Sequence, residues 1–369
     1  MEKNKNPKVL HIINEMGLGG AEVLLMESLY LFAEKSLTAD LLVLIARDKS
    51  ALIPEMRGKE MFNVTTLNKE NYYDPLLVFK LMPHIRKYDI VHVHLFPSLY
   101  WVVLAKILSF SKVKLVFTEH STNNKRMNKF LFSLADRLFY SFYRKIITIS
   151  EDVDIVLKKH LKFKDSRFKL IHNGINLRKI SKALPYPVTD FFPDAGADTK
   201  IIMMVAGFKR PKDHETLIRA ISILPAHIKL LLAGNGDTRP EAENLVSELN
   251  LQDRVKFLGA RKDVPDLLKT ADILVLSSKY EGLSLSSVEG MAAGKPFIAT
   301  EVPGLIDVVK NAGLLFPFGD EQKLVEIITQ LLSDRAYYNE IAARCVEKAK
   351  SYDIEQMINK EIELYKSIV

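Results

Sequence analysis

The chain has 369 residues, 48% of them hydrophobic, which predicts a globular protein large enough for two domains with substantial buried cores. Its single cysteine, Cys345, excludes an internal disulfide, so nothing points to an oxidising compartment. No apolar run reaches the roughly 18 residues that a membrane span requires, and we therefore expect a cytoplasmic protein.

The formal net charge of +7 is unevenly distributed. Residues 1–200 carry 31 basic and 21 acidic side chains, a net +10, whereas residues 201–369 carry 21 and 24, a net −3. Residues 123–145 mix Lys and Arg with aromatic residues, which is typical of a helix lying on an anionic membrane and equally of a partly buried helix with a basic edge. Nucleic-acid binding is a weaker interpretation, because no recognition motif accompanies the charge.

Strands and helices are expected to alternate through both halves of the chain. In the first half, strands are expected at 8–14, 39–46, 90–94, 114–118 and 145–150, and helices at 21–35, 75–88 and 98–109. In the second half, strands are expected at 199–206, 228–233, 255–258 and 271–278, and helices at 214–224, 240–249 and 264–270.

This alternation predicts an α/β protein with two doubly wound, Rossmann-like domains that face each other across a cleft. The first domain is expected at 1–180 and the second at 199–350. A Pro- and Gly-containing stretch at 181–198 breaks the periodicity and is predicted to be a linker. Ligands are expected in the cleft, at the carboxyl ends of both sheets.

Glu281 and Glu289 bracket a Gly- and Ser-containing turn between the strand at 271–278 and a helix. Taken alone, two glutamates eight positions apart can be two solvated charges. On one helix they would lie roughly 12 Å apart, at about 1.5 Å per residue, which suits the two ends of a sugar linked to a nucleotide. The free N–H groups of the helix start favour the phosphates between them.

The segment Tyr280-Glu-Gly-Leu-Ser-Leu-Ser-Ser-Val-Glu-Gly-Met-Ala-Ala-Gly-Lys-Pro296 resembles the signature of retaining nucleotide-sugar glycosyltransferases of family 4 (group 1), which have the GT-B fold. The resemblance implies that Glu289 binds the ribose hydroxyls. It implies that Glu281, with the amides of Gly282, Leu283 and Ser284, holds the transferred sugar and the pyrophosphate. It further implies that the helix at 352–369 packs back on the first domain.

Gly17, Gly19 and Gly20 follow the first strand and open the first helix. Their spacing is not that of a dinucleotide fingerprint, and such a turn is often no more than a tight turn. It does resemble the Gly-Gly-Ala-Glu turn of the family, which implies that Gly19 and Gly20 lie beside the donor.

His92 and His94 lie on one face of the strand at 90–94, with His94 at its carboxyl end. A zinc site would need further ligands, and none with metal spacing is nearby. The resemblance implies that His94 meets the donor sugar and the reacting centre, and His92 is interpreted as a packing residue. The next strand ends at Glu119 and His120, which are candidate acceptor-binding residues.

Lys125 and Arg126, in the basic segment that follows, are also candidate acceptor-binding residues. In the second half, Arg210 and Lys212 follow a strand and could neutralise a pyrophosphate leaving group. The segment resembles the phosphate-binding lysine segment of the family, although Gly207 stands where many members carry an arginine. Arg261 lies in a loop that resembles those near the nucleotide.

These features together predict a metal-independent, retaining transferase that needs no cofactor. It would move a hexose-type sugar from UDP or GDP to a hydroxyl of a lipid-linked or cell-surface glycan, with peripheral contact to the inner face of an anionic membrane and no nucleic acid as partner. The alternatives are a nucleotide-sugar 2-epimerase of the same shape and a non-catalytic nucleotide-sugar- or glycan-binding protein. Gly207 favours the latter slightly.

Overall fold

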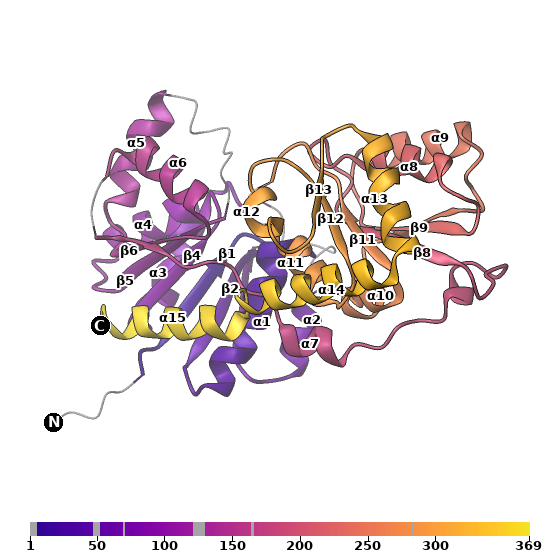
Figure 1. Ribbon diagram of the computed structural model, residues 1–369. Coiled ribbons are helices and arrows are strands. Elements are labelled where there is room, and N and C mark those ends of the chain that lie inside the picture. Colours follow the sequence, from indigo (N-terminus) through magenta and orange to yellow (C-terminus); the bar gives the residue numbers. More distant parts are fainter. Residues whose placement is uncertain (1–5, 47–51, 69–70, 121–129, 164–165, 282–283) are drawn as a thin grey trace. The chain divides into compact units, whose positions relative to one another are not determined.

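The computed structural model describes residues 6–46, 52–68, 71–120, 130–163, 166–281 and 284–369 (Figure 1). Two compact units divide the chain between them. The first consists of Met1–Gly174 together with Ile354–Val369, and the second of Ile175–Asp353. None of the helices formed by described residues is long and apolar enough to cross a membrane.

The first unit is built on a seven-stranded parallel sheet in the order β3-β2-β1-β4-β5-β6-β7. Its strands are β1 (Val9–Ile13), β2 (Ala39–Ile45), β3 (Val64–Asn68), β4 (Ile90–His94), β5 (Lys114–Glu119), β6 (Lys145–Thr148) and β7 (Phe168–Leu170). Its helices are α1 (Gly20–Glu34), α2 (Ile53–Gly58), α3 (Leu77–Ile85), α4 (Ser98–Leu108), α5 (Phe130–Tyr140), α6 (Glu151–Leu161) and α15 (Ile354–Lys366).

The central strands of this sheet are buried along their whole length. All residues of β1, β2 and β4 are buried, because helices cover both faces of a doubly wound sheet. Such strands appear in a sequence as continuous apolar runs, which is why they were predictable.

The C-terminal helix α15, yellow in Figure 1, belongs to the first unit although 179 residues of the second unit precede it. It packs against α1, where Lys35 Nζ lies 3.4 Å from the Glu355 carboxylate. Tyr365 is fully buried and its ring lies 6.0 Å from that of Phe32. The end of the chain therefore completes the core of the unit that the beginning forms.

The second unit is built on a six-stranded parallel sheet in the order β10-β9-β8-β11-β12-β13. Its strands are β8 (Lys200–Val205), β9 (Ile228–Ala233), β10 (Val255–Gly259), β11 (Ile273–Leu276), β12 (Phe297–Thr300) and β13 (Leu314–Phe316). Its helices are α7 (Leu177–Lys182), a 3-10 helix (Val188–Asp190), α8 (His214–Ile223), α9 (Arg239–Glu248), α10 (Val264–Thr270), α11 (Leu285–Ala292), α12 (Ile306–Val309), α13 (Glu321–Ser333) and α14 (Arg335–Lys350).

The stretch at 181–198, expected to be a linker, lies within the second unit. Phe192 is fully buried in the core of that unit, and Tyr186 Oη donates a hydrogen bond to Asp263 at 2.6 Å. The Pro and Gly residues that suggested a linker give an irregular backbone that is held in place by these aromatic side chains. The predicted fold class, two doubly wound Rossmann-like domains, is confirmed.

Helix α11, which carries Glu289, lies so close to β12 that one position excludes a side chain. A Cβ atom added at Gly290 would lie 2.5 Å from the Phe297 ring. Gly290→Ala should therefore lower the free energy of unfolding by about 1–3 kcal/mol, the usual cost of overpacking. Urea denaturation measures the change. Gly58→Ala is the control, because that helical position has open space; an equal loss there would contradict the argument.

Candidate functional site

The loops that follow β8 and β11 meet at the carboxyl edge of the second sheet, because these two strands are neighbours. Backbone hydrogen bonds join them: Asp213 N donates to Ser277 O at 3.0 Å and Lys279 N donates to Pro211 O at 2.7 Å. The side chain of Ser277 donates to Asp213 at 2.8 Å, and Asp213 also caps α8. The two loops therefore form one rigid platform.

Two predicted catalytic residues meet on this platform. Lys212 Nζ donates a hydrogen bond to Glu281 Oε1 within an ion pair, and the hydroxyl of Ser278 donates to the same oxygen at 2.6 Å. The side chains of Lys212 and Glu281 are 18% and 13% exposed, so solvent reaches the pair. A cation and a carboxylate that can exchange partners thus lie side by side.

Helix α11 begins directly after this pair. Ser284 is its N-cap residue, its first turn holds no acidic side chain, and Glu289 lies half-buried on the helix. The exposed N–H groups at such a helix start attract anions. The placement of Glu281 in the loop and of Glu289 on the helix is as predicted, while Gly282 and Leu283 lie outside the described residues.

The two remaining residues of this unit that were predicted to bind the nucleotide sugar, Arg210 and Arg261, differ in whether they form an ion pair. Arg210 is exposed and forms no ion pair with a described residue. Arg261 Nε, in contrast, donates to Asp263 Oδ1 at 2.8 Å, and this ion pair lowers the pKa of the Asp263 carboxyl group to about 2. The role of Arg261 in donor binding stays a prediction, and it would have to use the N–H groups that Asp263 leaves free.

Two glycines in the loop after β9 allow this loop to pack closely against the loop after β8. A Cβ atom at Gly234 or Gly236 would lie 2.0 Å from the carbonyl oxygen of Ala206 or Phe208, respectively. Both glycines also have positive φ, at 150° and 157°, which other residues rarely adopt. Phe208 N donates to Asn235 O at 3.0 Å, so the loop that contains Gly207 is held by backbone contacts.

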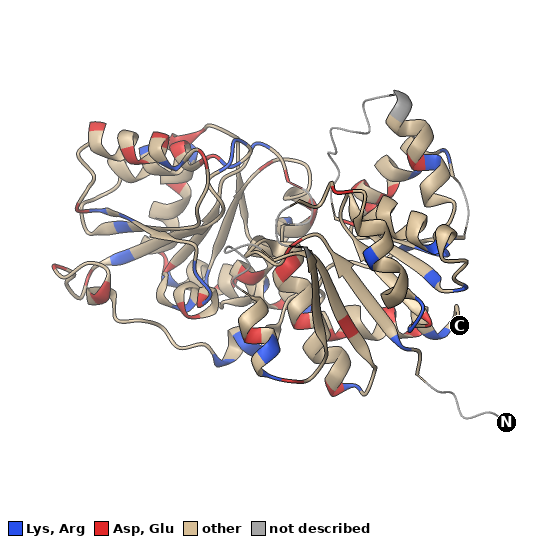
Figure 2. Cartoon of the chain, turned by 180° about the vertical axis from the view of Figure 1, so that it is seen from behind, with Lys and Arg blue, Asp and Glu red and all other residues tan. Residues whose placement is uncertain are grey.

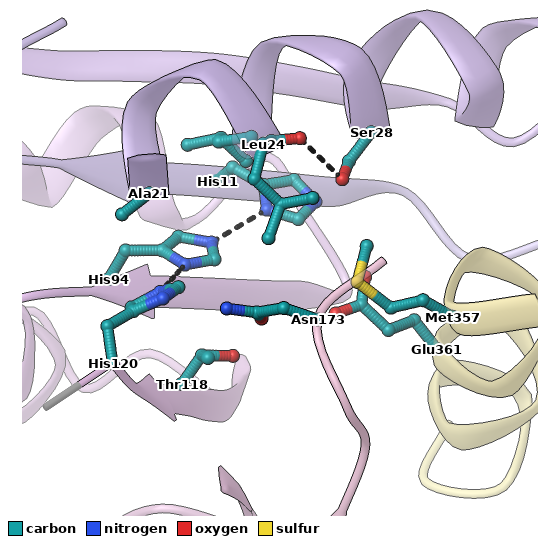
Figure 3. Close-up of a pocket in the computed structure, with 11 residues that line it drawn as sticks. His11, Ala21, Leu24, Ser28, His94, Thr118, His120, Asn173, Met357 and Glu361 are labelled. Carbon is teal, nitrogen blue, oxygen red and sulfur yellow. Dashed lines mark hydrogen bonds between the residues drawn. The ribbon is translucent and has the colours of Figure 1, made fainter. Parts of the chain in front are cut away.

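In the first unit, β1, β4 and β5 bring a row of imidazoles onto one face of the sheet (Figure 3). His11 Nδ1 and His94 Nε2 are 3.1 Å apart, and His94 Nδ1 and His120 Nε2 are 3.2 Å apart. His92 pairs with His11 in the strand register, and its nitrogens lie 2.6 Å from Tyr365 Oη and 2.7 Å from Thr118 Oγ1.

His94, predicted to meet the donor sugar, uses both ring nitrogens inside this cluster and is only 6% exposed. Burial holds its pKa well below the ordinary value, so the ring is neutral near pH 7. The nitrogens without a hydrogen-bond partner among the described residues are His11 Nε2 and His120 Nδ1. His120 is the less buried residue of the two, but its Nδ1 atom is itself buried, and its contact with the acceptor stays a prediction.

Glu119 points to the other face of the first sheet, because successive side chains of a strand alternate. It is buried and accepts a hydrogen bond from Tyr140 Oη at 2.9 Å. Its acceptor role stays a prediction. Lys125 and Arg126 lie outside the described residues.

At the start of α1, Gly19 is the N-cap residue and Gly20 the first helical residue. A Cβ atom at Gly19 would lie 2.4 Å from the end of the flexible Glu22 side chain, which can move aside, so this contact does not by itself require glycine. Gly19 and Gly20 are exposed, and the predicted glycine turn is exposed backbone at a helix start.

Sequence reasoning missed His11, Glu361 and Tyr365. A cavity with about 20 Å³ of water-accessible space is lined by His11, Ala21, Leu24, Leu25, Ser28, His94, Thr118, His120, Asn173, Met357 and Glu361. Nitrogens of His11, His92 and His94 lie within 4.8 Å of one another, close enough for a metal ion. The sequence did show His11 within a strand expected to be buried. Which histidines lie beside it depends on the order of the strands in the sheet, which the sequence did not give.

Two family models match consecutive parts of the chain: Glycosyltransferase Family 4 at residues 18–179 and Glycosyl transferases group 1 at residues 189–352. The chain belongs to the group 1 glycosyltransferases of family 4. The predicted family is thus confirmed, and the matched ranges follow the two halves of this glycosyltransferase.

Curated relatives are similar over much of their length. This glycosyltransferase is 26% identical to N-acetyl-alpha-D-glucosaminyl L-malate synthase of Bacillus anthracis over 290 aligned residues. The alignment covers 76% of the chain and 75% of the relative. It is 26% identical over 250 residues to N,N'-diacetylbacillosaminyl-diphospho-undecaprenol alpha-1,3-N-acetylgalactosaminyltransferase of Campylobacter jejuni, which covers 65% of each. Anabaena HepE, solved in complex with UDP and glucose, matches 98% of the chain and 100% of its own length with a TM-score of 0.83 at 21% identity, which shows the GT-B fold.

Glu361 should make the stability of the glycosyltransferase depend on pH. Burial raises the pKa of its carboxyl group to about 8, well above the value of about 4.3 in an unfolded chain. The folded state binds this proton more tightly, so the free energy of unfolding should fall as the pH rises from about 4 to about 8. Glu361→Gln should remove this loss and be more stable than wild type above pH 8 by about 2–4 kcal/mol.

Urea denaturation between pH 5 and pH 9 measures this effect. Glu363→Gln, an exposed position of the same helix, is the control and should retain the wild-type pH dependence. Equal pH dependence in wild type and Glu361→Gln would contradict the assignment.

Proposed function

We propose that this glycosyltransferase moves a hexose-type sugar from a UDP- or GDP-sugar to a hydroxyl group of a lipid-linked or cell-surface glycan. The observation that carries the proposal is the partly exposed pair of Lys212 and Glu281 beside the start of α11. It offers a cation for a diphosphate and a carboxylate for sugar hydroxyls within one platform. A UDP complex of the similar HepE supports a nucleotide diphosphate as ligand.

In this proposal, Glu289 binds the ribose hydroxyls, and Lys212 and Arg210 bind the diphosphate together with the amides at the start of α11. The bond between the anomeric carbon and the diphosphate oxygen breaks, and the acceptor oxygen forms the new bond on the same face of the sugar. The hydroxyl proton passes to a phosphate oxygen of the departing diphosphate. Lys212, Arg210 and the helix-start amides would stabilise the departing diphosphate in this proposal, which invokes no metal ion or cofactor.

The first unit is proposed to bind the acceptor. The name of the Campylobacter relative states a diphospho-undecaprenol acceptor, which supports a lipid-linked glycan. His120 Nδ1 has no partner among the described residues, but the atom is buried, so an acceptor hydroxyl could bind it only if the surrounding side chains moved. His94 would then act through the ring of His120 rather than by touching the sugar itself.

Thermal unfolding in the presence of UDP, GDP, ADP and their sugar conjugates tests the proposal, because a ligand that binds the folded state raises its stability. A selective rise with one nucleotide sugar, followed by its consumption when a glycan acceptor is added, supports transfer. Interconversion of the nucleotide sugar without an acceptor would indicate the epimerase. Binding with no turnover would indicate a binding protein, which Gly207 favours.

Glu289→Ala and Glu281→Ala should separate binding from turnover. Loss of the ribose contact in Glu289→Ala should raise the Kd of the selected nucleotide about tenfold, as expected for a lost hydrogen bond to a charged group. Glu281→Ala should lower kcat about a hundredfold but leave nucleotide affinity unchanged or improved, because Lys212 loses a competing anion. Isothermal titration and nucleotide release measure the two effects.

Glu248→Ala, an exposed position on α9, is the control and should match wild type in both measurements. Wild-type kinetics in both site variants would contradict the assignment of the donor site.

A membrane surface is the proposed location of the acceptor. Leu134 and Leu138, four residues apart on α5, are 61% and 60% exposed, and Phe142 follows at 36%. Lys and Arg are interspersed with Asp and Glu along the helices of both units (Figure 2), so charge alone does not mark a docking face. The exposed apolar side of α5 would supply the remaining attraction.

Leu134→Ser combined with Leu138→Ser should weaken binding to phosphatidylglycerol vesicles about tenfold or more, since each Leu contributes on the order of 1 kcal/mol when it enters the interface. Vesicle co-sedimentation measures the binding. Leu184→Ser combined with Ile223→Ser removes exposed apolar residues from the second unit and should leave binding intact. Equal losses in the two double variants would exclude α5 as the docking face.

A further inference from the structure

We propose that the first unit contains a buried transition-metal site formed by His11, His92 and His94. A divalent ion that prefers nitrogen ligands, such as Zn²⁺, is the expected occupant. The site shares His94 with the proposed acceptor contact, but its test measures metal binding and does not depend on transferase activity.

The spacing of the imidazoles fits a single ion. One nitrogen of each ring lies within 4.8 Å of the others, and the closest pair, His11 Nδ1 and His94 Nε2, is 3.1 Å apart. Two nitrogens bound to one tetrahedral Zn²⁺ at about 2.0–2.1 Å lie about 3.3 Å from each other. The separation of this pair is therefore close to that of two zinc-bound nitrogens, and the hydrogen bond between them would be given up when both bind the ion.

The sheet fixes this arrangement before any ion binds. His11 and His92 are register partners on the neighbouring strands β1 and β4. His94 lies two residues beyond His92 on the same face, with ring centroids 4.3 Å apart. Because both strands are buried along their whole length, the three ligands come from rigid backbone.

Outer contacts already orient two of the rings, as they do around metal-bound histidines. His94 Nδ1 is 3.2 Å from His120 Nε2. His92 contacts the hydroxyls of Thr118 and Tyr365, and one of these contacts must be given up for its nitrogen to reach the ion. The other contact then holds the ring in place.

Space for a fourth ligand and a carboxyl group both lie beside the rings. The cavity lined by His11, His94 and Glu361 has about 20 Å³ of water-accessible space, enough for one water molecule. Glu361 is the carboxyl group among the residues that line it, and it forms no ion pair with a described residue. A buried dication needs such a partner, because an uncompensated charge in this interior is costly.

Metal titration of the full chain, made without a histidine tag and stripped with a chelator, tests the site. We expect one Zn²⁺ per chain by elemental analysis after dialysis, a higher Tm with Zn²⁺, and the intense visible absorption of tetrahedral Co²⁺ when Co²⁺ is used as the probe. No bound metal, or Co²⁺ with the weak spectrum of the hydrated ion, would overturn the proposal.

Variants locate the ion. His11→Asn and His94→Gln should each weaken Zn²⁺ binding by at least about tenfold, the lower end of losses seen even for outer contacts of metal ligands. His227→Asn, an exposed histidine of the second unit, should bind like wild type. Circular dichroism in the presence of a chelator shows whether each variant folds without metal. Two different ligand variants are used so that one can still locate the ion if the other does not fold. Unchanged affinity in a folded ligand variant, or a loss in His227→Asn, would overturn the site.

Discussion

The parallel pairing of β1 with β4, and of β8 with β11, is the constraint on which the site residues of both units depend. These strands are distant in sequence but neighbours in their sheets, so their carboxyl ends and the loops beyond them share an edge. In the second unit the pairing brings Lys212 to Glu281, and in the first it brings His11 to His94. His11 and His94 lie on the strands themselves, so a one-residue shift in the register of β1 and β4 would place them on opposite faces of the sheet.

The two sites differ in charge and in exposure to solvent. The imidazoles of the first unit are buried and neutral, so they contribute hydrogen bonds and lone pairs but no charge near pH 7. The pair of Lys212 and Glu281 is charged and partly exposed, and an ion pair of that kind contributes little to stability. The first cluster is thus suited to orienting a hydroxyl or holding a cation, whereas the second is suited to exchanging partners with a ligand.

The sequence predicted the fold class because most central strands are long apolar runs, but it missed β3, β7, β12 and β13. The strands β3, β7 and β13 are partly exposed, and β12 is buried but has only four residues. It placed Glu281 in a loop and Glu289 on a helix, since periodicity marks where a helix begins. It could not assign His11 to the histidine cluster, because that contact depends on the strand order. It also took the Pro-rich stretch around Phe192 for a linker, because burial of one aromatic ring leaves no periodic pattern.

The ion pair between Lys212 and Glu281 means that the cation proposed to bind the diphosphate is not left as a costly unpaired charge. The Glu281 carboxylate neutralises the Lys212 ammonium, and the Ser278 hydroxyl donates a hydrogen bond to the same oxygen. In the proposed function, a diphosphate carries more negative charge than one carboxylate and would also contact the amides at the start of α11, so it would displace Glu281 from Lys212. The released carboxylate would then be available for sugar hydroxyls. Donor binding would in this way prepare the acidic group that positions the sugar, and the absence of an arginine at Gly207 leaves Lys212 and Arg210 as the cations for this exchange.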